Sequence, residues 1–163
     1  MSPDASWIAT ASFHGCGVNV WDGRTGRLVR NLFPTENGQV AASPDGQSLA
    51  VATHTAFGVW NATTWEPRWR VAQKLGSAAG GPVAFRPDGT LLAVAPARQE
   101  IKLLDPSTGR ELASLTAPDG RNVEELAFSP DGDRLAAGTG LHSIHLWDLK
   151  TLRRELAALG LDW

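Results

Sequence analysis

The side chains that could carry out chemistry are few, and the densest group is the run His14-Gly15-Cys16. A cysteine acts as a nucleophile when its surroundings lower the thiol pKa and a neighbouring histidine is held in place by a third group. No third group is evident beside this pair. We therefore interpret it as a loop thiol next to a loop histidine and expect no nucleophilic catalysis there.

A second candidate is the pair His142 and His145, which lie three residues apart. That spacing brings two metal ligands together on a helix, but on a strand it points the two side chains to opposite faces of the sheet. The surrounding residues 143–147 are typical of a strand. We therefore expect no metal site here, and we predict no cofactor for the chain.

Recurring carboxylates form the third candidate, because Asp45, Asp88 and Asp131 each stand in a Pro-Asp-Gly sequence. Paired acid and base catalysis by two carboxylates requires them to lie within about 10 Å of each other. These three are separated by whole repeat units, and Pro-Asp-Gly is typical of tight turns. We expect them to shape turns and predict no catalytic residue.

Composition limits the classes of function further. The 163 residues carry 15 Lys and Arg against 17 Asp and Glu, a net charge of −2, with a single cysteine. The near-neutral balance argues against nucleic acid or an anionic membrane as the main partner. One cysteine forms no internal disulfide, no segment has the length and apolarity of a membrane span, and the first residues do not resemble a signal peptide. These features predict a cytoplasmic location.

The 17 glycines and 10 prolines indicate many turns, and the turns recur at a fixed interval. Pro-Asp appears at Pro3, Pro44, Pro87 and Pro130, at intervals of 41, 43 and 43 residues. A second marker keeps the same period at Trp21-Asp22, Trp60-Asn61, Leu104-Asp105 and Trp147-Asp148. Two markers in phase four times indicate an internal repeat.

Each repeat is predicted to consist of short strands. In the last unit, residues 123–128, 134–138 and 143–147 are typical of strands, and Ser129-Pro130-Asp131-Gly132 is the turn between the first two. Units two and three add an outer strand at 68–71 and 111–115. The run Leu92-Ala93-Val94-Ala95 has no polar alternation, which predicts that both faces of its sheet are covered.

The repeats resemble WD40 repeats over nearly the whole chain. The resemblance rests on residues 127–132 and 84–89, which read Ala-Phe-Ser-Pro-Asp-Gly and Ala-Phe-Arg-Pro-Asp-Gly, and on the Trp-Asp or Leu-Asp endings. It implies an all-β propeller whose blades each have four antiparallel strands, a to d from the centre outward, and which serves as a platform for other proteins. The family's polar network is only partly present, since Trp21, Trp60 and Trp147 remain but the b–c loops lack the expected Asp.

Residues 1–148 are accordingly predicted to form about four blades, at 1–33, 37–71, 80–115 and 121–148. The first blade lacks strand a. Residues 149–163 are predicted to be an amphipathic helix and tail in place of a final strand d, because leucines at 149, 152, 156 and 159 fall on one helical face and Gly160 comes next. A partial ring leaves two apolar end faces uncovered. We expect a fragment of a longer propeller; the alternatives are two copies forming an eight-bladed ring, or a closed four-bladed ring.

The C-terminal segment from Trp147 to Trp163 resembles the end of the WD40 region of large bacterial proteins of planctomycete type, in which a serine/threonine kinase domain often precedes the propeller. The chain contains no Gly-rich loop followed by a strand Lys, no His-Arg-Asp and no Asp-Phe-Gly. The resemblance implies the non-catalytic part of such a protein.

One pattern suggests a binding surface. His14, His54, Arg98 and His142 fall at similar places in the four b–c loops, five to seven residues before the closing Trp or Leu. We hypothesise that they line a cationic, pH-sensitive patch for an acidic peptide; the alternative is that these loops accept any polar residue.

A second pattern is an apolar row formed by Trp65, Trp69 and Val71 at alternate positions of an outer strand. It is either an exposed docking stripe or a surface packed against the neighbouring blade.

The sequence thus predicts a non-enzymatic protein-interaction or scaffolding module that binds a protein or peptide and neither nucleic acid nor membrane. Self-association, or completion by further blades, fits the same pattern. A propeller enzyme would require metal carboxylates or a Ser-His-Asp set that converge on a channel, and the sequence suggests neither. A purely structural spacer is the remaining alternative.

Overall fold

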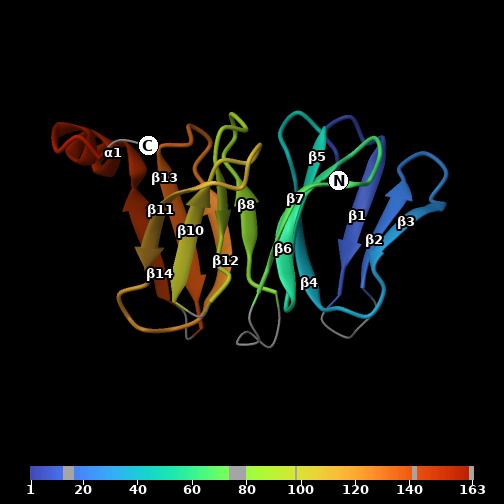
Figure 1. The fold of residues 1–163 in the computed structure, drawn as a ribbon, viewed down its shortest axis with the longest axis horizontal. Coiled ribbons are helices and arrows are strands. Elements are labelled where there is room, and N and C mark those ends of the chain that lie inside the picture. The colour runs from blue at the N-terminus through green and yellow to red at the C-terminus, as the bar shows by residue number, and fades with distance from the viewer. Residues whose placement is uncertain (13–16, 74–79, 98, 141–142, 162–163) are drawn as a thin grey trace.

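The computed structural model describes residues 1–163 except 13–16, 74–79, 98, 141–142 and 162–163. Its described part contains four separate antiparallel sheets, which stand side by side in chain order, from blue on the right of Figure 1 to red on the left. We call them sheets I to IV. Contacts between sheets run from I to II, II to III and III to IV.

Sheets I and IV each have three described strands, and sheets II and III each have four. Sheet I contains β1 (Trp7–Ala11), β2 (Val18–Asp22) and β3 (Leu28–Phe33). Sheet II contains β4 (Gly38–Ala42), β5 (Ser48–Thr53), β6 (Ala56–Asn61) and β7 (Pro67–Ala72). Sheet III contains β8 (Val83–Phe85), β9 (Leu92–Val94), β10 (Glu100–Leu104) and β11 (Glu111–Thr116). Sheet IV contains β12 (Val123–Phe128), β13 (Arg134–Thr139) and β14 (Ser143–Asp148).

The Pro-Asp-Gly turns join strands a and b, as the sequence predicts. In each, the glycine N–H donates to the carbonyl of the residue three positions earlier, and φ is +70° at Gly46, +74° at Gly89 and +72° at Gly132. A residue without a Cβ adopts this conformation at low cost. Before β1 the same turn has Ala5 in the glycine position, at φ +56°.

The core lies between the sheets. One buried cluster fills the space between sheets I and II, a second lies between II and III, and a third lies between III and IV. Strand β5 is buried at every position, from Ser48 to Thr53, because it has a neighbouring sheet on each face. Leu92, Ala93, Val94 and Ala95 are also all buried, so the prediction that both faces are covered is confirmed there. In β13 of sheet IV only alternate positions are buried.

The C-terminal helix α1 (Leu149–Ala158) begins directly after β14. Asp148 is its N-cap, since its carboxylate accepts a hydrogen bond from the Thr151 N–H at 2.8 Å. The helix ends in a Schellman motif, in which Gly160 adopts φ +74° and the Leu161 N–H donates to the Leu156 carbonyl. Leu149 is buried against sheets III and IV, while Leu159 is 73% exposed and lies off the packed face.

The fold class is confirmed: the chain is all-β with a short C-terminal helix, and its four sheets are consistent with part of a WD40 propeller. No helix among the described residues has the length and apolarity required to cross a membrane.

Candidate functional site

The two ends of the strands form two rims with different chemistry. One end of the strands carries the a–b turns, the c–d turns and α1, and lies at the top of Figure 1. We call this end the turn rim. The opposite end, with the b–c loops and the connections from one sheet to the next, is the loop rim.

A groove on the turn rim lies between helix α1 and sheet III, and we call it the helix groove. Its volume is about 370 Å³. Its lining is Arg86, Leu91, Asp133, Leu149, Lys150, Arg153, Arg154 and Ala157. A second hollow of about 250 Å³ shares three of these residues and adds Thr90, Asp105, Arg110 and Leu112. Cationic side chains outnumber carboxylates in the combined surface, and aliphatic side chains form its floor.

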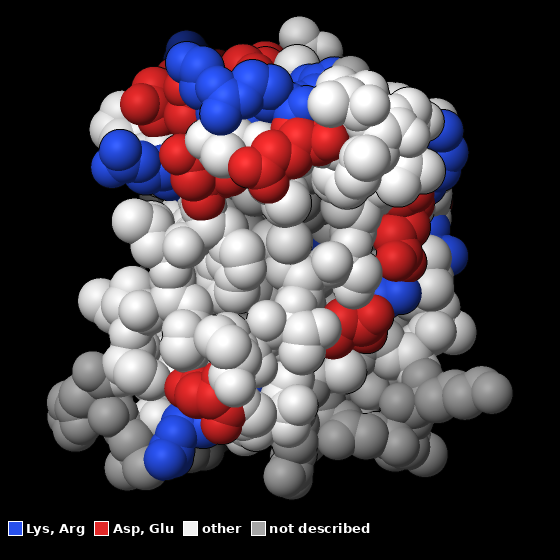
Figure 2. Space-filling model, turned by 90° about the vertical axis from the view of Figure 1, so that its left-hand side faces the viewer, with Lys and Arg blue, Asp and Glu red and all other residues white. Residues whose placement is uncertain are grey.

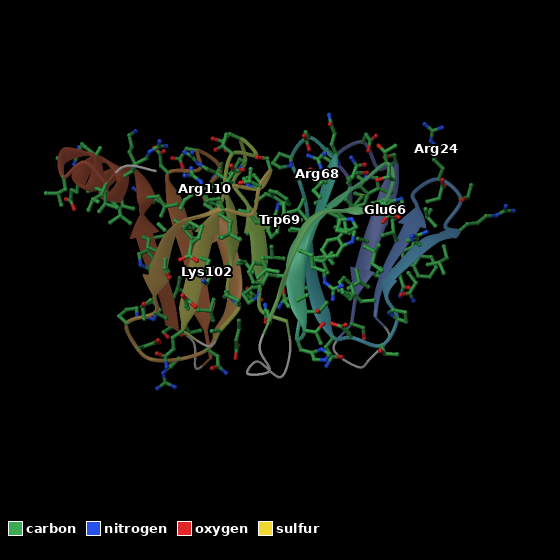
Figure 3. All side chains as sticks on the ribbon, viewed as in Figure 1. Arg24, Glu66, Arg68, Trp69, Lys102 and Arg110 are labelled. Carbon is green, nitrogen blue, oxygen red and sulfur yellow. The ribbon has the colours of Figure 1, made fainter. Side chains whose placement is uncertain are left out.

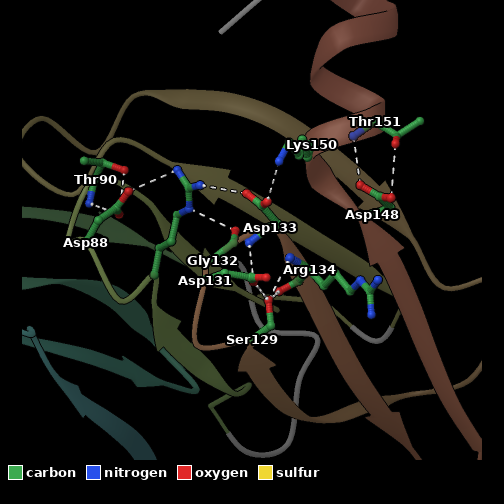
Figure 4. A network of polar contacts seen from close by, with 11 residues as sticks. Asp88, Thr90, Ser129, Asp131, Gly132, Asp133, Arg134, Asp148, Lys150 and Thr151 are labelled. Carbon is green, nitrogen blue, oxygen red and sulfur yellow. Dashed lines mark hydrogen bonds and ion pairs between the residues drawn. The ribbon is translucent and has the colours of Figure 1, made fainter.

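Arg86 holds the rim together at this point. Its Nε donates to the Gly132 carbonyl at 2.9 Å, and its guanidinium pairs with Asp88 at 3.1 Å and with Asp133 at 3.7 Å. Lys150, from α1, reaches the other carboxylate oxygen of Asp133 at 3.1 Å (Figure 4). The network therefore links a turn of sheet III, a turn of sheet IV and the helix.

The turn carboxylates are fixed by their own turns. A hydrogen bond from the Ser43 hydroxyl lowers the pKa of Asp45, and one from Ser129 lowers the pKa of Asp131. Partial burial raises the pKa of Asp88, but bonds from Thr90 outweigh it and the net pKa is lowered. Each of the three carboxylates also accepts the backbone N–H of the residue two positions later, so these aspartates shape turns.

On the loop rim, three of the four predicted patch residues, His14, Arg98 and His142, lie outside the described residues. His54 is described, and its Nδ1 lies 3.9 Å from a carboxylate oxygen of Glu36, which belongs to the connection between sheets I and II. The Thr55 hydroxyl donates to the same Glu36 oxygen at 2.6 Å. The surroundings of His54 thus include an anion, and the cationic patch stays a prediction.

A second polar cluster on the loop rim gathers around Asp119, in the connection between sheets III and IV. Its Oδ2 accepts hydrogen bonds from Thr139 at 3.0 Å and from Ser143 at 3.1 Å. His145 Nε2 lies 3.0 Å from the same oxygen, as an electrostatic contact outside hydrogen-bond angles. The contact with His145 and the hydroxyl bonds hold the pKa of Asp119 well below its usual range.

The Asp119 cluster contains the residue types of a Ser-His-Asp triad but not the connections of one. Nucleophilic catalysis requires the hydroxyl to bond to the imidazole, which then takes its proton. Here the Ser143 hydroxyl bonds to Asp119 and to Thr139. The cluster instead fixes the connection between sheets III and IV to β13 and β14. The described residues hold no group of three His, Cys, Asp or Glu that could bind a metal ion.

The predicted row of Trp65, Trp69 and Val71 is divided among three environments. Trp65 lies in the c–d turn at φ +58° and packs edge-on against Trp7 of sheet I, with ring centroids 5.3 Å apart. Trp69, labelled near the centre of Figure 3, donates its indole N–H to the Pro106 carbonyl of sheet III at 2.9 Å. Val71 is 43% exposed. The alternative of packing against neighbouring blades therefore holds for both tryptophans.

Two site residues were missed by the sequence reasoning. The signal for Arg86 is a break in the repeat, because the other units have Ser2, Ser43 and Ser129 at its position. Asp119 lies in the connection between sheets III and IV, whereas the family pattern predicts the acidic residue of the polar network in the b–c loop. A signal for it is Pro118-Asp119-Gly120, a further Pro-Asp-Gly that falls outside the period of the repeat.

Comparison with known proteins finds similar repeats. Residues 109–148 match the model of the WD domain, G-beta repeat, a span that contains β11 and the whole of sheet IV. The chain is 29% identical over 162 residues to the WD repeat-containing protein SL1-17 of Schistosoma mansoni, covering 93% of this chain and 50% of that protein. It is 29% identical over 103 residues to echinoderm microtubule-associated protein-like 2 of Rattus norvegicus, covering 63% of this chain and 15% of that protein. The human protein of that name is 27% identical over 103 residues.

These matches support the WD40 repeat family for this chain. The chain spans half the length of one of these relatives and a smaller share of the others. The relatives come from animals, so the resemblance to bacterial kinase-linked proteins stays a prediction.

Proposed function

We propose that this chain is a non-enzymatic WD40 module that binds an acidic segment of a protein partner in the helix groove. The observation that supports this most directly is the combination of the repeat type with the charge and apolarity of the helix groove. The repeat match supports a protein-interaction role, and the helix groove offers clustered cations above an aliphatic floor.

Charge favours an acidic partner. The groove and its neighbouring hollow present Arg86, Arg110, Lys150, Arg153 and Arg154 against the carboxylates Asp105 and Asp133. Arg86 and Lys150 both pair with Asp133, which fixes their position without neutralising the surface as a whole. Complementary charge of this kind raises the association rate and excludes partners of the same sign.

The aliphatic floor determines the second feature of the partner. Leu91 and Leu149 are buried at the base of the groove, while Leu112 and Ala157 lie along it. A peptide that alternates acidic and aliphatic side chains would meet both the cations and this floor.

A direct test is fluorescence anisotropy with a labelled peptide of alternating Glu and Leu. Arg110→Glu combined with Arg154→Glu is expected to weaken binding at least tenfold, since two attractive contacts become repulsive. The matched control is Arg24→Glu with Arg27→Glu, which makes the same charge change on the exposed c–d turn of sheet I. Equal loss in both variants, or equal binding of a Lys and Leu peptide, would contradict the proposal.

The loop-rim patch is a second hypothesis, carried by the positions of His14, His54, Arg98 and His142. Its test is His54→Ala combined with Arg98→Ala. Peptide affinity that is unchanged by these substitutions and unchanged between about pH 5.5 and 7.5 would exclude it.

We further propose that the module works in the cytoplasm as part of a larger regulatory protein, of which a kinase-linked protein is one form. The greater length of its relatives supports the larger protein.

A further inference from the structure

The side of sheet IV away from sheet III has the residue pattern of a surface between two sheets. We call the face of a sheet turned to the next sheet in the chain its trailing face, and the opposite one its leading face. In sheet II the trailing face carries Phe57 and Val59, which are 7% and 1% exposed in the cluster with sheet III. In sheet III it carries Ile101 and Leu103, both 0% exposed in the cluster with sheet IV.

Sheet IV has Ile144 and Leu146 at these positions, counted back from its closing Trp147. They are 75% and 60% exposed. The strand register is also the same, because Leu146 lies opposite Ala136 as Val59 lies opposite Ala50. Figure 2 shows this end of the molecule: charged side chains gather at the turn rim, and below them lies a broad surface with few charges.

The leading face of sheet I carries the matching pattern. Ile8, Trp21 and Leu28 lie opposite one another on its three strands. The corresponding row of sheet II is Leu49, Trp60 and Pro67, of which the first two are buried against sheet I. Ile8 and Trp21, the counterparts of these two buried residues, are by contrast partly exposed. The two ends of the chain therefore present the two halves of one kind of interface.

We propose that this chain associates head to tail, with the trailing face of sheet IV in one copy packed against the leading face of sheet I in a second copy. The proposal goes beyond the binding function proposed above and does not rest on it. Each of the three contacts inside the chain joins a trailing face to a leading face, so the proposed contact continues a packing that the structure repeats three times.

The polar positions of the two faces also correspond. Next to the apolar row of sheet IV, Glu125 lies opposite Gly138, as Gln39 lies opposite Ala52 in sheet II. The second row of sheet I contains Thr10, Asn19 and Asn31. Hydroxyl and amide groups can donate hydrogen bonds to the Glu125 carboxylate, so the second copy offers apolar groups to the apolar row and donors to the acid.

The test is the mass of the purified chain, measured by light scattering after gel filtration over a range of concentrations. The chain itself is expected to give at least twice its monomer mass of 17.4 kDa. A trailing variant (Ile144→Arg with Leu146→Arg) and a leading variant (Ile8→Arg with Thr10→Arg) are each expected to be monomeric. The counterparts of Ile8 and Thr10 in sheet II are Leu49 and Val51, which are buried against sheet I. None of the four substituted positions is buried, so folding is expected to persist, and circular dichroism verifies it.

Mixing the two variants separates this arrangement from others. In a head-to-tail contact the mixture keeps one intact pair of faces, so the mass is expected to rise again to that of a dimer. The matched control, Leu159→Arg with Leu161→Arg, changes two exposed aliphatic side chains of the C-terminal segment and should leave the mass unchanged. A monomeric parent chain would overturn the proposal. So would a leading variant that still dimerises, because sheet IV would then pair with its own copy.

Discussion

Sheets III and IV are built from the same repeat but differ in what covers them. Both faces of sheet III are packed, and its trailing residues Ile101 and Leu103 are fully buried. Sheet IV is packed on its leading face, through Leu135 and Ala137, while Ile144 and Leu146 on its trailing face are exposed. The residue types on the two trailing faces are nearly the same. The repeat therefore specifies the same residue types on this face whether or not another described sheet lies against it.

The two sheets also differ in the segment that comes after strand c. In sheet III, Asp105 begins a c–d turn that Gly109 completes at φ +74°. In sheet IV, Asp148 occupies the same position, and its carboxylate also accepts a backbone N–H, from the residue three positions later rather than two. The residue four positions later is Leu152 rather than a glycine. Glycine is not obligatory at that position, because Trp65 adopts φ +58° there in sheet II. Leu152 instead lies in α1, where it packs with Leu149 against the core between sheets III and IV.

The largest expected difference between the sheets comes from the matched pair Leu103→Ala and Leu146→Ala. Truncating the buried leucine creates a cavity and should cost about 2–5 kcal/mol in the free energy of unfolding. Truncating its exposed counterpart should change that free energy by less than about 0.5 kcal/mol. Urea denaturation at a concentration where the chain is monomeric measures both. Equal losses would mean that Leu146 is covered within a single chain.

A second pair compares the c–d turns of sheets III and I. A Cβ added at Gly109 would lie 2.6 Å from the Trp69 ring, whereas one added at Gly26 meets nothing within 4 Å. Both glycines have positive φ, so Gly26→Ala should cost about 1 kcal/mol from backbone strain alone. Gly109→Ala should cost at least about 1 kcal/mol more, because Trp69 must also shift. Thermal unfolding followed by circular dichroism would show the difference, and equal losses would contradict the packing of Trp69 on this turn.

A third pair tests whether an aspartate has the same structural role in a c–d turn, as Asp105, and in a helix cap, as Asp148. Asp105→Ala and Asp148→Ala should each cost about 1 kcal/mol, since each removes the acceptor for a backbone N–H. The matched controls are Asp105→Asn and Asp148→Asn, because Asn61 fills this role in sheet II. The controls should recover most of the loss in chemical denaturation. If the alanine loss occurred at only one of the two positions, the equivalence of turn and helix cap would fail.

The smallest effect concerns pH and the Asp119 cluster, which ties sheet IV to the connection from sheet III. The pKa of Asp119 is lower in the folded chain than its ordinary value of about 3.9, so ionisation stabilises the fold above that value. The stabilisation is lost as the pH falls through the lower, folded pKa. Asp119→Asn should therefore be less stable than the parent chain at neutral pH, and the gap should narrow as the pH falls below about 4. Acid titrations of both proteins would measure it, with Glu155→Gln as a control at an exposed position of α1. A constant gap would contradict the ionic role.

Many of the features that sheets III and IV share can be predicted from the sequence. The period of the Pro-Asp and Trp-Asp markers predicts four units, and the turn glycines predict where strands a and b meet. The leucines at 149, 152 and 156, together with Gly160, predict the helix and its end. These features are local, since each depends on the conformational preferences of a few consecutive residues.

Other features depend on contacts between distant segments. Trp65 continues an outer strand by its spacing, but the fold places it in the left-handed conformation that glycine has in the turns of sheets I and III. Asp119 lies 20 residues from Thr139 in the sequence, and the pairing of β12 with β13 brings them together. Arg86 reaches Gly132, 46 residues away, because sheets III and IV stand side by side. No local pattern encodes these contacts.

The sequence by itself determined the repeat, its strands, its turns and the residue types on each face, because alternation along a strand and the needs of a tight turn act over a few residues. Only the tertiary structure decided which of those faces are covered. Leu103 and Leu146 are the same residue at the same place in the repeat, and they are distinguished solely by whether another sheet lies against them.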